Sequence, residues 1–528
     1  MITRFTLFLV LLTGVASARK FYDDDPILRE PQPRDVGALQ ARKLSDVYDL
    51  FSLQFADLGE RQPPPGSKKP SIRAQGINTI ENPFDNAWWE PRHFFQRMTP
   101  DQLRRGPGNS TAPSTRRKWT ILGVKSEGVT PGFRMLDADN RQYFVKFDPL
   151  SNPEMATAAD RISSKIFYAM GYHVPENYLI YFKEDQLQLG DDVELATASG
   201  KKRKMTLRDL YEILLKVPKT ADGRYRGTAS LSLPGKPIGP PRYFGSRTDD
   251  PNDVVPHEHR RDQRALQVFC AWLGHEDSRA INNIDITVQQ DGLRFIRHYL
   301  LDFGSTLGSA STKANSVRSG LPFFSWSEAA KNFFSLGLHV SYVDFAKYPH
   351  LPSVGRLEAK TFDPERWVPE YPNPAFRNAL PDDEFWAAKQ VMSLTDADLK
   401  AIVETGEYSD PRAAEWVTQV LIARRDKIGK AFFARVLPLD RFAVRDRQLA
   451  WEDLSGTAGS VSVQWHHFDN PSEQRTAISN ATTAQVPAFS ETGYLLAELT
   501  RPSQPKQKVF VYLRRREGTP IVGVERAW

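Results

Sequence analysis

Residues 256–308 read PHEHRRDQRALQVFCAWLGHEDSRAINNIDITVQQDGLRFIRHYLLDFGSTLG, and this stretch decides the expected fold. It contains His275 and Asp277 in the order H-x-D, and Asn282 follows five positions after the aspartate. The tripeptide D-F-G comes next, at 302–304. These polar residues form the candidate site of the chain.

Two strand patterns separate Asn282 from Asp302. Residues 283–288 and 293–301 read as strands, and Gln-Gln-Asp-Gly joins them. The Asp-Gly pair is a strong signal for a tight hairpin turn. Because a hairpin brings its outer ends together, we expect Asn282 and Asp302 to lie side by side although twenty positions separate them.

A buried helix is expected just before the loop with Asp277. Leu266, Phe269, Cys270 and Leu273 recur at i, i+3, i+4 and i+7, which is the spacing of one apolar helix face. Cys270 is the only cysteine of the chain. We therefore interpret it as a small buried hydrophobe and expect no internal disulfide.

The order H-x-D-x-x-x-x-N followed by D-F-G resembles the catalytic core of protein kinases. The resemblance implies that Asp277 lies beside the attacking hydroxyl, while Asn282 and Asp302 hold Mg²⁺ or Mn²⁺. The structural alternative is that these three residues cap a turn, start a strand and form a turn. The expected fold is α+β and bilobal, like protein kinases: a small β-rich N-lobe, a mainly helical C-lobe and a small all-β C-terminal sandwich.

Three strand patterns, at 119–124, 133–136 and 142–147, are expected to begin the N-lobe. Gly123 and Gly128 lie in the loop between the first two, where kinases cover the phosphates of ATP with backbone N–H groups. The glycines do not have the G-x-G-x-x-G spacing. A plain hairpin loop is therefore the alternative.

Lys146 lies at the end of the third strand pattern, in Tyr-Phe-Val-Lys-Phe. It resembles the kinase lysine that contacts the nucleotide phosphates, and a solvated strand lysine is the alternative. The resemblance also implies an acidic partner for this lysine. Glu154 is the first choice and Asp160 the second, and we predict an ion pair between Lys146 and Glu154.

A helix is expected at 155–170, with Asn152 as its N-cap, Pro153 at its first position and Gly171 as its stop. Together with the Val-Pro and the strand that follow, this segment is similar to atypical kinases of the HipA, spore-coat CotH and phosphoinositide-kinase group. The resemblance covers residues from about 119 to 436.

The chain has 528 residues and divides into five expected parts. These are a signal peptide at 1–18, an N-terminal extension and linker with one short helix at 19–118, the N-lobe at 119–245, the C-lobe at 246–440 and a β-sandwich-like domain at 441–528. The charged, Pro-containing residues 19–43 are expected to be poorly ordered. Helices are expected in the C-lobe at 385–392, 396–404 and 411–436, and strands in the last part at 460–465, 493–499, 508–513 and 519–525.

Residues 1–18, MITRFTLFLVLLTGVASA, have the basic, apolar and small-residue regions of a secretory signal peptide. A membrane anchor is the alternative, although the apolar run is short for a span. We expect an exported protein of the periplasm, cell envelope or exterior, with no membrane span after the leader is removed. The net charge of +6 forms no continuous basic block, so no nucleic-acid partner is expected, and the oligomeric state stays open.

Three functional interpretations remain at this point. The first is an exported kinase-like phosphotransferase that moves a phosphoryl group from ATP, or another nucleoside triphosphate, to a protein or small-molecule hydroxyl. The second is a kinase-fold nucleotide- or ligand-binding module without turnover. The third is a structural envelope protein in which the β-domain performs the function. The presence of Asp277, Asn282 and Asp302 together favours the first. The glycine spacing in the loop at 123–132 and the expected export favour the second.

Overall fold

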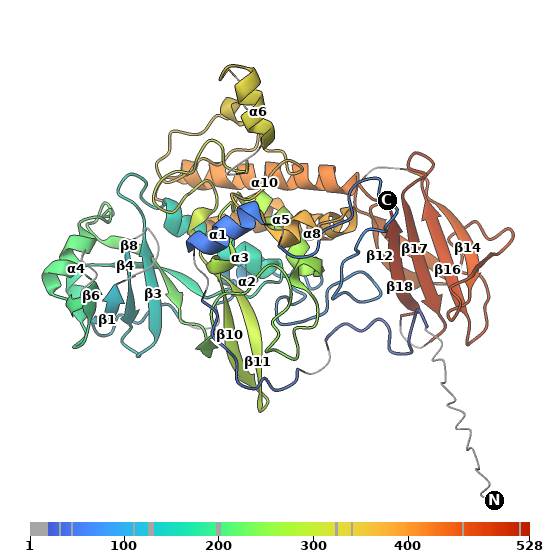
Figure 1. Ribbon diagram of the computed structural model, residues 1–528, viewed down its shortest axis with the longest axis horizontal. Helices are drawn as coiled ribbons and strands as arrows, with labels where there is room; N and C mark the ends of the chain where they lie inside the picture. The colour runs from blue at the N-terminus through green and yellow to red at the C-terminus, as the bar shows by residue number, and fades with distance from the viewer. Residues whose placement is uncertain are drawn as a thin grey trace, which may run out of the picture. The chain divides into compact units, whose positions relative to one another are not determined.

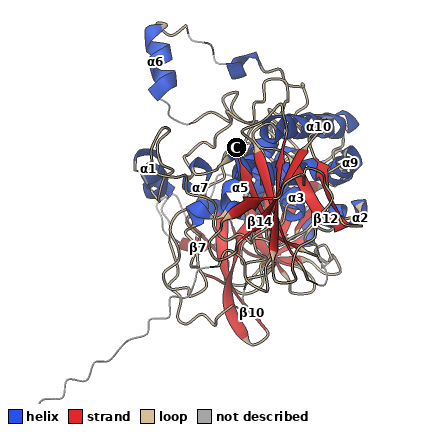
Figure 2. Cartoon of the chain, turned by 90° about the vertical axis from the view of Figure 1, so that its right-hand side faces the viewer, coloured by secondary structure: helices blue, strands red, loops and turns tan. Residues whose placement is uncertain are grey.

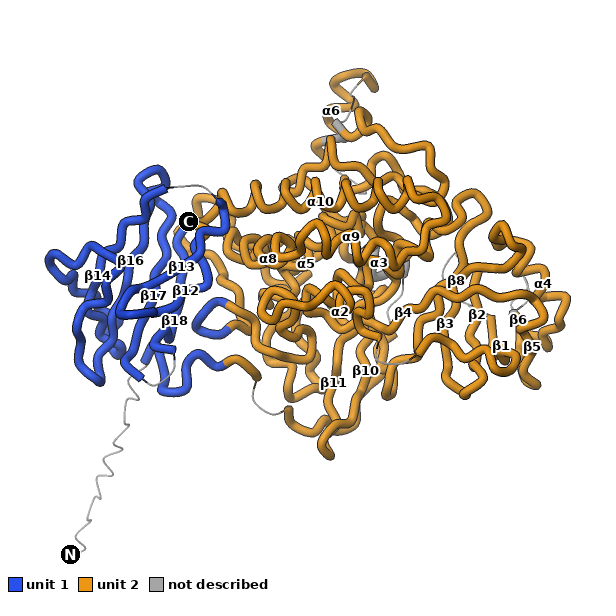
Figure 3. Tube along the Cα trace, turned by 180° about the vertical axis from the view of Figure 1, so that it is seen from behind, with its two compact units in different colours: residues 1–27, 78–81, 439–528 blue, residues 28–77, 82–438 orange. Residues whose placement is uncertain are grey.

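The computed structural model describes residues 19–30, 33–43, 46–56, 58–108, 111–124, 131–196, 202–322, 326–338, 340, 342–456, 459–516 and 519–528. It forms two compact units (Figure 3). Unit 1 comprises the described parts of 1–27, 78–81 and 439–528, and unit 2 comprises those of 28–77 and 82–438. The expected signal peptide, residues 1–18, lies outside the described residues.

A six-stranded sheet in the order β4-β8-β3-β2-β1-β5 forms the expected N-lobe of unit 2. Its strands are β1 Trp119–Val124, β2 Gly132–Leu136, β3 Gln142–Phe147, β4 Asn177–Phe182, β5 Leu187–Leu189 and β8 Tyr225–Leu231. The three predicted strands are thereby confirmed. In β3, Tyr143, Val145 and Phe147 are buried in the core, whereas Phe144 and Lys146 alternate with them on the opposite face.

Smaller elements complete the N-lobe. They are the helices α3 Met155–Ala169 and α4 Leu207–Leu214, the 3-10 turn η1 Glu184–Gln186 and the two-stranded ribbon β6 Glu194–Ala196 with β7 Lys202–Lys204. Asn152 does not cap α3 as predicted. The carboxylate of Asp148 instead accepts bonds from the backbone N–H and hydroxyl of Thr157, at 2.9 and 2.6 Å. Asn152 lies in the turn before the helix, where its side chain donates to the carbonyl of Pro352.

The predicted hairpin is confirmed as β10 Asn283–Gln290 and β11 Leu293–Leu300, paired antiparallel from Asn283 opposite Leu300 (Figure 2). Asp291 and Gly292 at its tip have φ of 51° and 81°, the left-handed geometry that a two-residue hairpin turn requires. A third strand, β9 Lys236–Pro237, pairs with β10. The short turns η3 Ala280–Asn282 and η4 Phe303–Ser305 lie at the two outer ends of the hairpin.

Helices dominate the rest of unit 2 (Figure 1). They are α1 Asp46–Phe55, α2 Pro100–Arg105, α5 Arg261–Leu273, α6 Trp326–Phe334, α7 Pro374–Arg377, α8 Pro381–Ser393, α9 Asp396–Glu404 and α10 Pro411–Phe433, with the 3-10 turns η2 His257–His259 and η5 Tyr342–Phe345. The predicted helix before the loop with Asp277 is α5. It is tied to α8 by a buried ion pair between Arg261 and Asp383, at 3.0 Å, and to α10 by the indole of Trp272, which donates to the Leu421 carbonyl.

The helices predicted in the C-lobe are confirmed, each starting within about four residues of its expected position. Within the described residues, we find no helix that combines the length and the apolar character needed to cross a membrane.

Unit 1 is all-β. A five-stranded sheet in the order β15-β14-β16-β17-β18 accompanies the two-stranded pair β12-β13. The strands are β12 Leu439–Arg445, β13 Gln448–Asp453, β14 Ser462–Phe468, β15 Arg475–Ala477, β16 Tyr494–Thr500, β17 Lys508–Arg514 and β18 Ile521–Ala527. The chain is therefore mixed α+β, with an N-terminal sheet, a helical region and separate all-β sheets at the C-terminus.

The start of the extension contributes to the core of unit 1, contrary to the expected disorder of residues 19–43. Phe21 is 3% exposed and packs against Phe468, Tyr494 and Tyr512, with ring centroids 4.9–6.1 Å apart. The amide side chain of Asn470 bonds to both the N–H and the carbonyl of Phe21, at 2.9 and 2.8 Å. The free energy gained by burying this ring and forming these two hydrogen bonds orders the start of the segment despite its polar composition.

Replacing Phe21 with alanine should destabilise unit 1 by about 3–5 kcal/mol, because the aromatic core would lose a buried ring. Equilibrium unfolding in urea, followed by near-ultraviolet circular dichroism, measures this loss. Tyr22→Ala is the matched control, since Tyr22 is 60% exposed and should change stability by less than about 0.5 kcal/mol. Equal effects of the two substitutions would contradict the packing of Phe21.

Candidate active site

Lys146 and Asp302 form an ion pair. The Nζ of Lys146 donates to Oδ1 of Asp302 at 2.7 Å, although 156 positions separate the two residues. Lys146 lies in β3, where it is paired with Gly132 of β2 on one side and with Thr228 of β8 on the other. Asp302 follows β11. Their side chains are 22% and 34% exposed. The pair therefore joins the N-terminal sheet to the D-F-G turn.

The charge of Lys146 is maintained by nearby carboxylates. Burial favours the neutral amine, but Asp302 and Asp160 more than offset this effect and raise the pKa of Lys146 above its ordinary value. The lysine is thus a fixed cation at neutral pH. A fixed cation at this place can attract an anionic group such as a phosphate.

The second choice of acidic partner, Asp160, lies near Lys146, and the first choice does not. Asp160 is buried on α3, where its Oδ1 accepts the backbone N–H of Phe303 at 3.2 Å. Glu154 precedes α3 with φ of 69°, and its carboxylate accepts the N–H of Ser409 at 2.9 Å and lies 3.9 Å from Arg226. The predicted Lys146–Glu154 ion pair is therefore wrong, because α3 starts after Glu154 and turns Asp160 toward the D-F-G residues.

The D-F-G turn is held in an unusual backbone conformation. Asp302 has φ 58° and ψ 56°, a left-handed geometry that costs a non-glycine residue free energy and persists only where the surrounding structure enforces it. The turn is anchored by Phe303, which is 1% exposed and stacks on Phe167 of α3 at 5.0 Å. The ring of His275 also lies 6.1 Å from that of Phe303. Packing on both sides thus fixes the carboxylate of Asp302.

The hairpin brings Asn282 and Asp302 to one place, as predicted. The carbonyl of Asn282 accepts the N–H of Leu301, the residue before Asp302, at 3.0 Å. The side chain of Asn282 donates to the backbone carbonyl of Asp277 at 2.7 Å. The loop with Asp277 is therefore bonded to the base of the hairpin that carries Asp302.

Arg279 was not among the predicted site residues, yet its guanidinium forms an ion pair with the carboxylate of Asp277. Both side chains are about one-quarter exposed, at 23% and 24%. Glu370 lies in the same electrostatic environment, where burial, Glu276 and Asp277 raise its pKa and Arg279 opposes the increase. The one signal for this contact in the sequence is that Asp277 and Arg279, which carry opposite charges, lie only two positions apart.

The oxygen donors at the base of the hairpin fit Mg²⁺ or Mn²⁺. Asp302 offers a carboxylate and Asn282 an amide oxygen, and hard divalent ions prefer such ligands and take the rest of their shell from phosphates and water. In the described part of the chain, we find no group of three or more His, Cys, Asp or Glu residues able to hold a metal. A nucleotide would therefore have to supply part of the coordination.

The predicted phosphate-covering loop is only partly described. Gly123 lies near the end of β1, beside an irregularity in the β1–β2 register, and a Cβ there would lie 3.1 Å from the guanidinium of Arg134. Gly128 belongs to 125–130, outside the described residues. The predicted role of both glycines at the phosphates stays a prediction.

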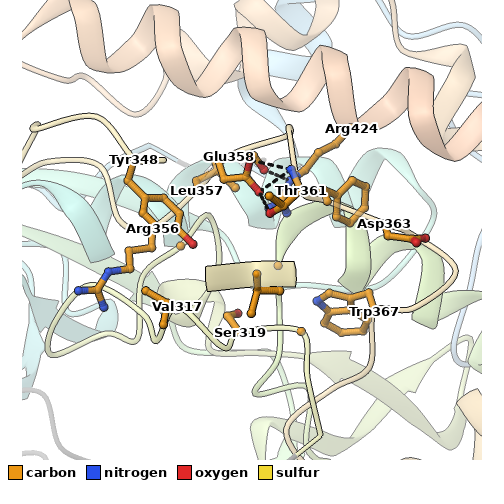
Figure 4. Close-up of a pocket in the computed structure, with 15 residues that line it drawn as sticks. Val317, Ser319, Tyr348, Arg356, Leu357, Glu358, Thr361, Asp363, Trp367 and Arg424 are labelled. Atoms are coloured by element: carbon orange, nitrogen blue, oxygen red, sulfur yellow. Dashed lines mark hydrogen bonds between the residues drawn. The ribbon is translucent and has the colours of Figure 1, made fainter. Parts of the chain in front are cut away.

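A separate cavity of about 50 Å³ lies in the segment after the D-F-G turn (Figure 4). The buried Arg424 donates to the carbonyl of Glu358 at 2.7 Å, and the Glu358 carboxylate accepts the N–H of Thr361. Burial lowers the pKa of Arg424 to about 10. The volume suits a few water molecules and is far below that of a typical ligand pocket, so we assign this cavity no ligand.

We compared the chain with protein families, curated proteins and solved structures. The sequence matches no family model, and no curated protein matches it. Several solved structures match, and three of them are structures of kinases. Their identities to this chain are 11–13%.

One of them is the Helicobacter pylori proinflammatory kinase CtkA, with 13% identity, a TM-score of 0.32, and 60% of this chain and 96% of that chain covered. The others are two structures of the Golgi casein kinase, one of them with Mn and ADP bound. Both have 11% identity and TM-scores of 0.31 and 0.30, and the match covers 64% of this chain and 74% of theirs.

Proposed function

We propose that unit 2 is a kinase-like phosphotransferase that moves a phosphoryl group from ATP, or another nucleoside triphosphate, to a protein or small-molecule hydroxyl. The observation that carries this proposal is the 2.7 Å ion pair between Lys146 and Asp302. This contact supports the proposal because it joins the lysine predicted to bind phosphates to the aspartate predicted to bind the metal. The loop with Asp277 is bonded to the same hairpin.

Each residue has a distinct role in this proposal. Lys146 attracts the phosphates of the nucleotide, and Asp160 keeps the lysine charged. Asn282 and Asp302 hold Mg²⁺ or Mn²⁺, which supplies neutralisation of phosphate charge when bound. Asp277 orients the acceptor hydroxyl and accepts its proton as the new P–O bond forms, while the bond from the terminal phosphorus to the departing nucleoside diphosphate breaks.

The pairing of Asp277 with Arg279 favours a second candidate function, a nucleotide- or ligand-binding module without turnover. The guanidinium of Arg279 occupies the carboxylate that would have to face the acceptor hydroxyl, and so competes with the role proposed for Asp277 in transfer. In this case the site would bind nucleotide and metal but transfer nothing. The two candidates therefore differ in turnover and agree in binding.

Two measurements on the parent protein test the proposal. In thermal unfolding with ATP or GTP, we expect Tm to rise only when Mg²⁺ or Mn²⁺ is also present, because the cation neutralises the phosphate charge beside the carboxylates of Asp277 and Asp302. Release of ADP in the presence of a hydroxyl acceptor, or slow hydrolysis without one, would establish turnover. Absence of any metal-dependent Tm shift with either nucleotide would contradict both candidate functions.

A further inference from the structure

A group of large apolar side chains on and just after α6 is exposed. We call residues 326–338 and 340 the α6 tip. The exposed fractions of Trp326, Phe333, Phe334 and Leu336 are 81%, 77%, 83% and 90%, and Leu338 reaches 81%. In two views at right angles, α6 stands away from the other helices of unit 2 (Figures 1 and 2). The α6 tip is therefore not part of the folded core.

The helix in the α6 tip is amphipathic, but its apolar side does not face the protein. Trp326, Ala330 and Phe333 follow i, i+4 and i+7, which places them on one face. In an ordinary surface helix this face would be buried against the core. Soluble proteins rarely expose a contiguous apolar surface of this kind unless it binds another molecule or a membrane.

Basic residues lie within the α6 tip and flank it in the sequence. Between residues 309 and 350 the sequence has four Lys or Arg residues and two Asp or Glu residues. All four basic side chains are exposed: Lys313, Arg318, Lys331 and Lys347. The local excess of positive charge would attract an anionic surface and disfavour a basic one.

The two ends of the segment that carries the α6 tip are held independently of the tip. The carbonyl of Gly308 accepts the N–H groups of both Asn315 and Arg356, at 2.8 Å each. The two ends of the intervening chain are thus fixed at one glycine, close in sequence to the D-F-G turn. The α6 tip can therefore engage a ligand while the candidate active site keeps its structure.

We propose that the α6 tip docks on an anionic lipid bilayer, with its aromatic side chains in the interfacial region and the basic residues against the head groups. Trp and Phe beside Lys and Arg are typical of segments that lie in a membrane interface. The exposed apolar residues include both the helix and the turn after it. A bilayer surrounds such a protrusion on all sides, whereas a flat protein partner would cover only one side.

Sedimentation with vesicles tests this proposal. The protein used lacks residues 1–18, because an apolar leader would bind lipid by itself. We expect it to sediment with vesicles of equal parts phosphatidylcholine and phosphatidylglycerol, and at least about tenfold more weakly with pure phosphatidylcholine, since each basic residue near an anionic surface adds attraction. Nucleotide is not required, so this result is separable from the proposed phosphotransferase function.

The test variant is Phe333→Ser/Phe334→Ser/Leu336→Ser, which should lower vesicle affinity at least about tenfold through loss of buried apolar area. Phe51→Ser/Phe55→Ser on α1 is the matched control, because these rings are 65% and 66% exposed at another surface of unit 2. It should bind vesicles like the parent. Thermal unfolding verifies that both variants are folded.

Several outcomes would overturn membrane docking by the α6 tip. One is failure of the parent to sediment with either kind of vesicle, and another is undiminished binding by the α6 variant or equal loss in the α1 control. If the parent bound neutral and anionic vesicles equally well, the basic residues would have no part in docking. A lipid-free dimer that dissociates in the α6 variant, seen by analytical ultracentrifugation, would assign the surface to a second copy of the chain.

Discussion

Asp302→Ala is expected to abolish metal-dependent nucleotide binding. The substitution removes the only carboxylate of the two proposed metal ligands and leaves Asn282, whose neutral amide alone holds divalent ions weakly. It also removes the partner of Lys146. For the parent, nucleotide and metal at about 100 times Kd should stabilise the folded state by ~2.7 kcal/mol, and thermal unfolding of the variant should show none of this gain.

Glu154→Gln is the control for this experiment. The sequence made Glu154 the first choice of partner for Lys146, but the structure places its carboxylate at the N–H of Ser409. The control should therefore keep nucleotide binding close to that of the parent. If Asp302→Ala binds nucleotide and metal as well as the parent does, the assignment of the D-F-G aspartate as a metal ligand is wrong.

Asp277→Asn is expected to leave nucleotide binding largely intact and to lower the rate of phosphoryl transfer by about 10²–10⁴-fold. The amide can still form hydrogen bonds but cannot accept the proton of the acceptor hydroxyl. Because acceptance of this proton contributes mainly in the transition state, the substitution should lower kcat while the nucleotide Kd changes little. Binding by calorimetry and transfer by ADP release separate these two quantities.

The same chemical change at the opposite end of the hairpin provides the control. Asp291 is exposed at the β10–β11 turn with φ of 51°, and asparagine tolerates this left-handed geometry. Asp291→Asn should therefore retain both binding and transfer. If the parent binds nucleotide but shows no transfer or hydrolysis with any divalent metal, the binding-module function gains support and the pairing of Arg279 with Asp277 explains it.

Local sequence signals were enough to predict the parts of the site that lie close together along the chain. Alternation and the Asp-Gly turn predicted β10 and β11, and from them the proximity of Asn282 to Asp302. Helical spacing predicted α5, and strand alternation predicted β3 with Lys146 at its end. Each depends on backbone periodicity or turn geometry, which a few neighbouring residues determine.

The choice among charged partners required the tertiary structure. Glu154 and Asp160 are both acids close to Lys146 in sequence, and their roles depend on where α3 begins. The bonds between Asp148 and Thr157 place the helix start after Glu154. Only then does Asp160 turn toward Phe303 and the lysine.

Long-range packing likewise decided whether two groups of aromatic residues are buried or exposed. Composition predicted the first wrongly and did not predict the second. Phe21 lies in a charged segment, yet its ring fills the aromatic core between β14, β16 and β17. No prediction of burial was made for the aromatic residues of α6, and the fold leaves them exposed. Composition determines how much apolar area a chain has, but burial depends on which surfaces the folded backbone brings into contact.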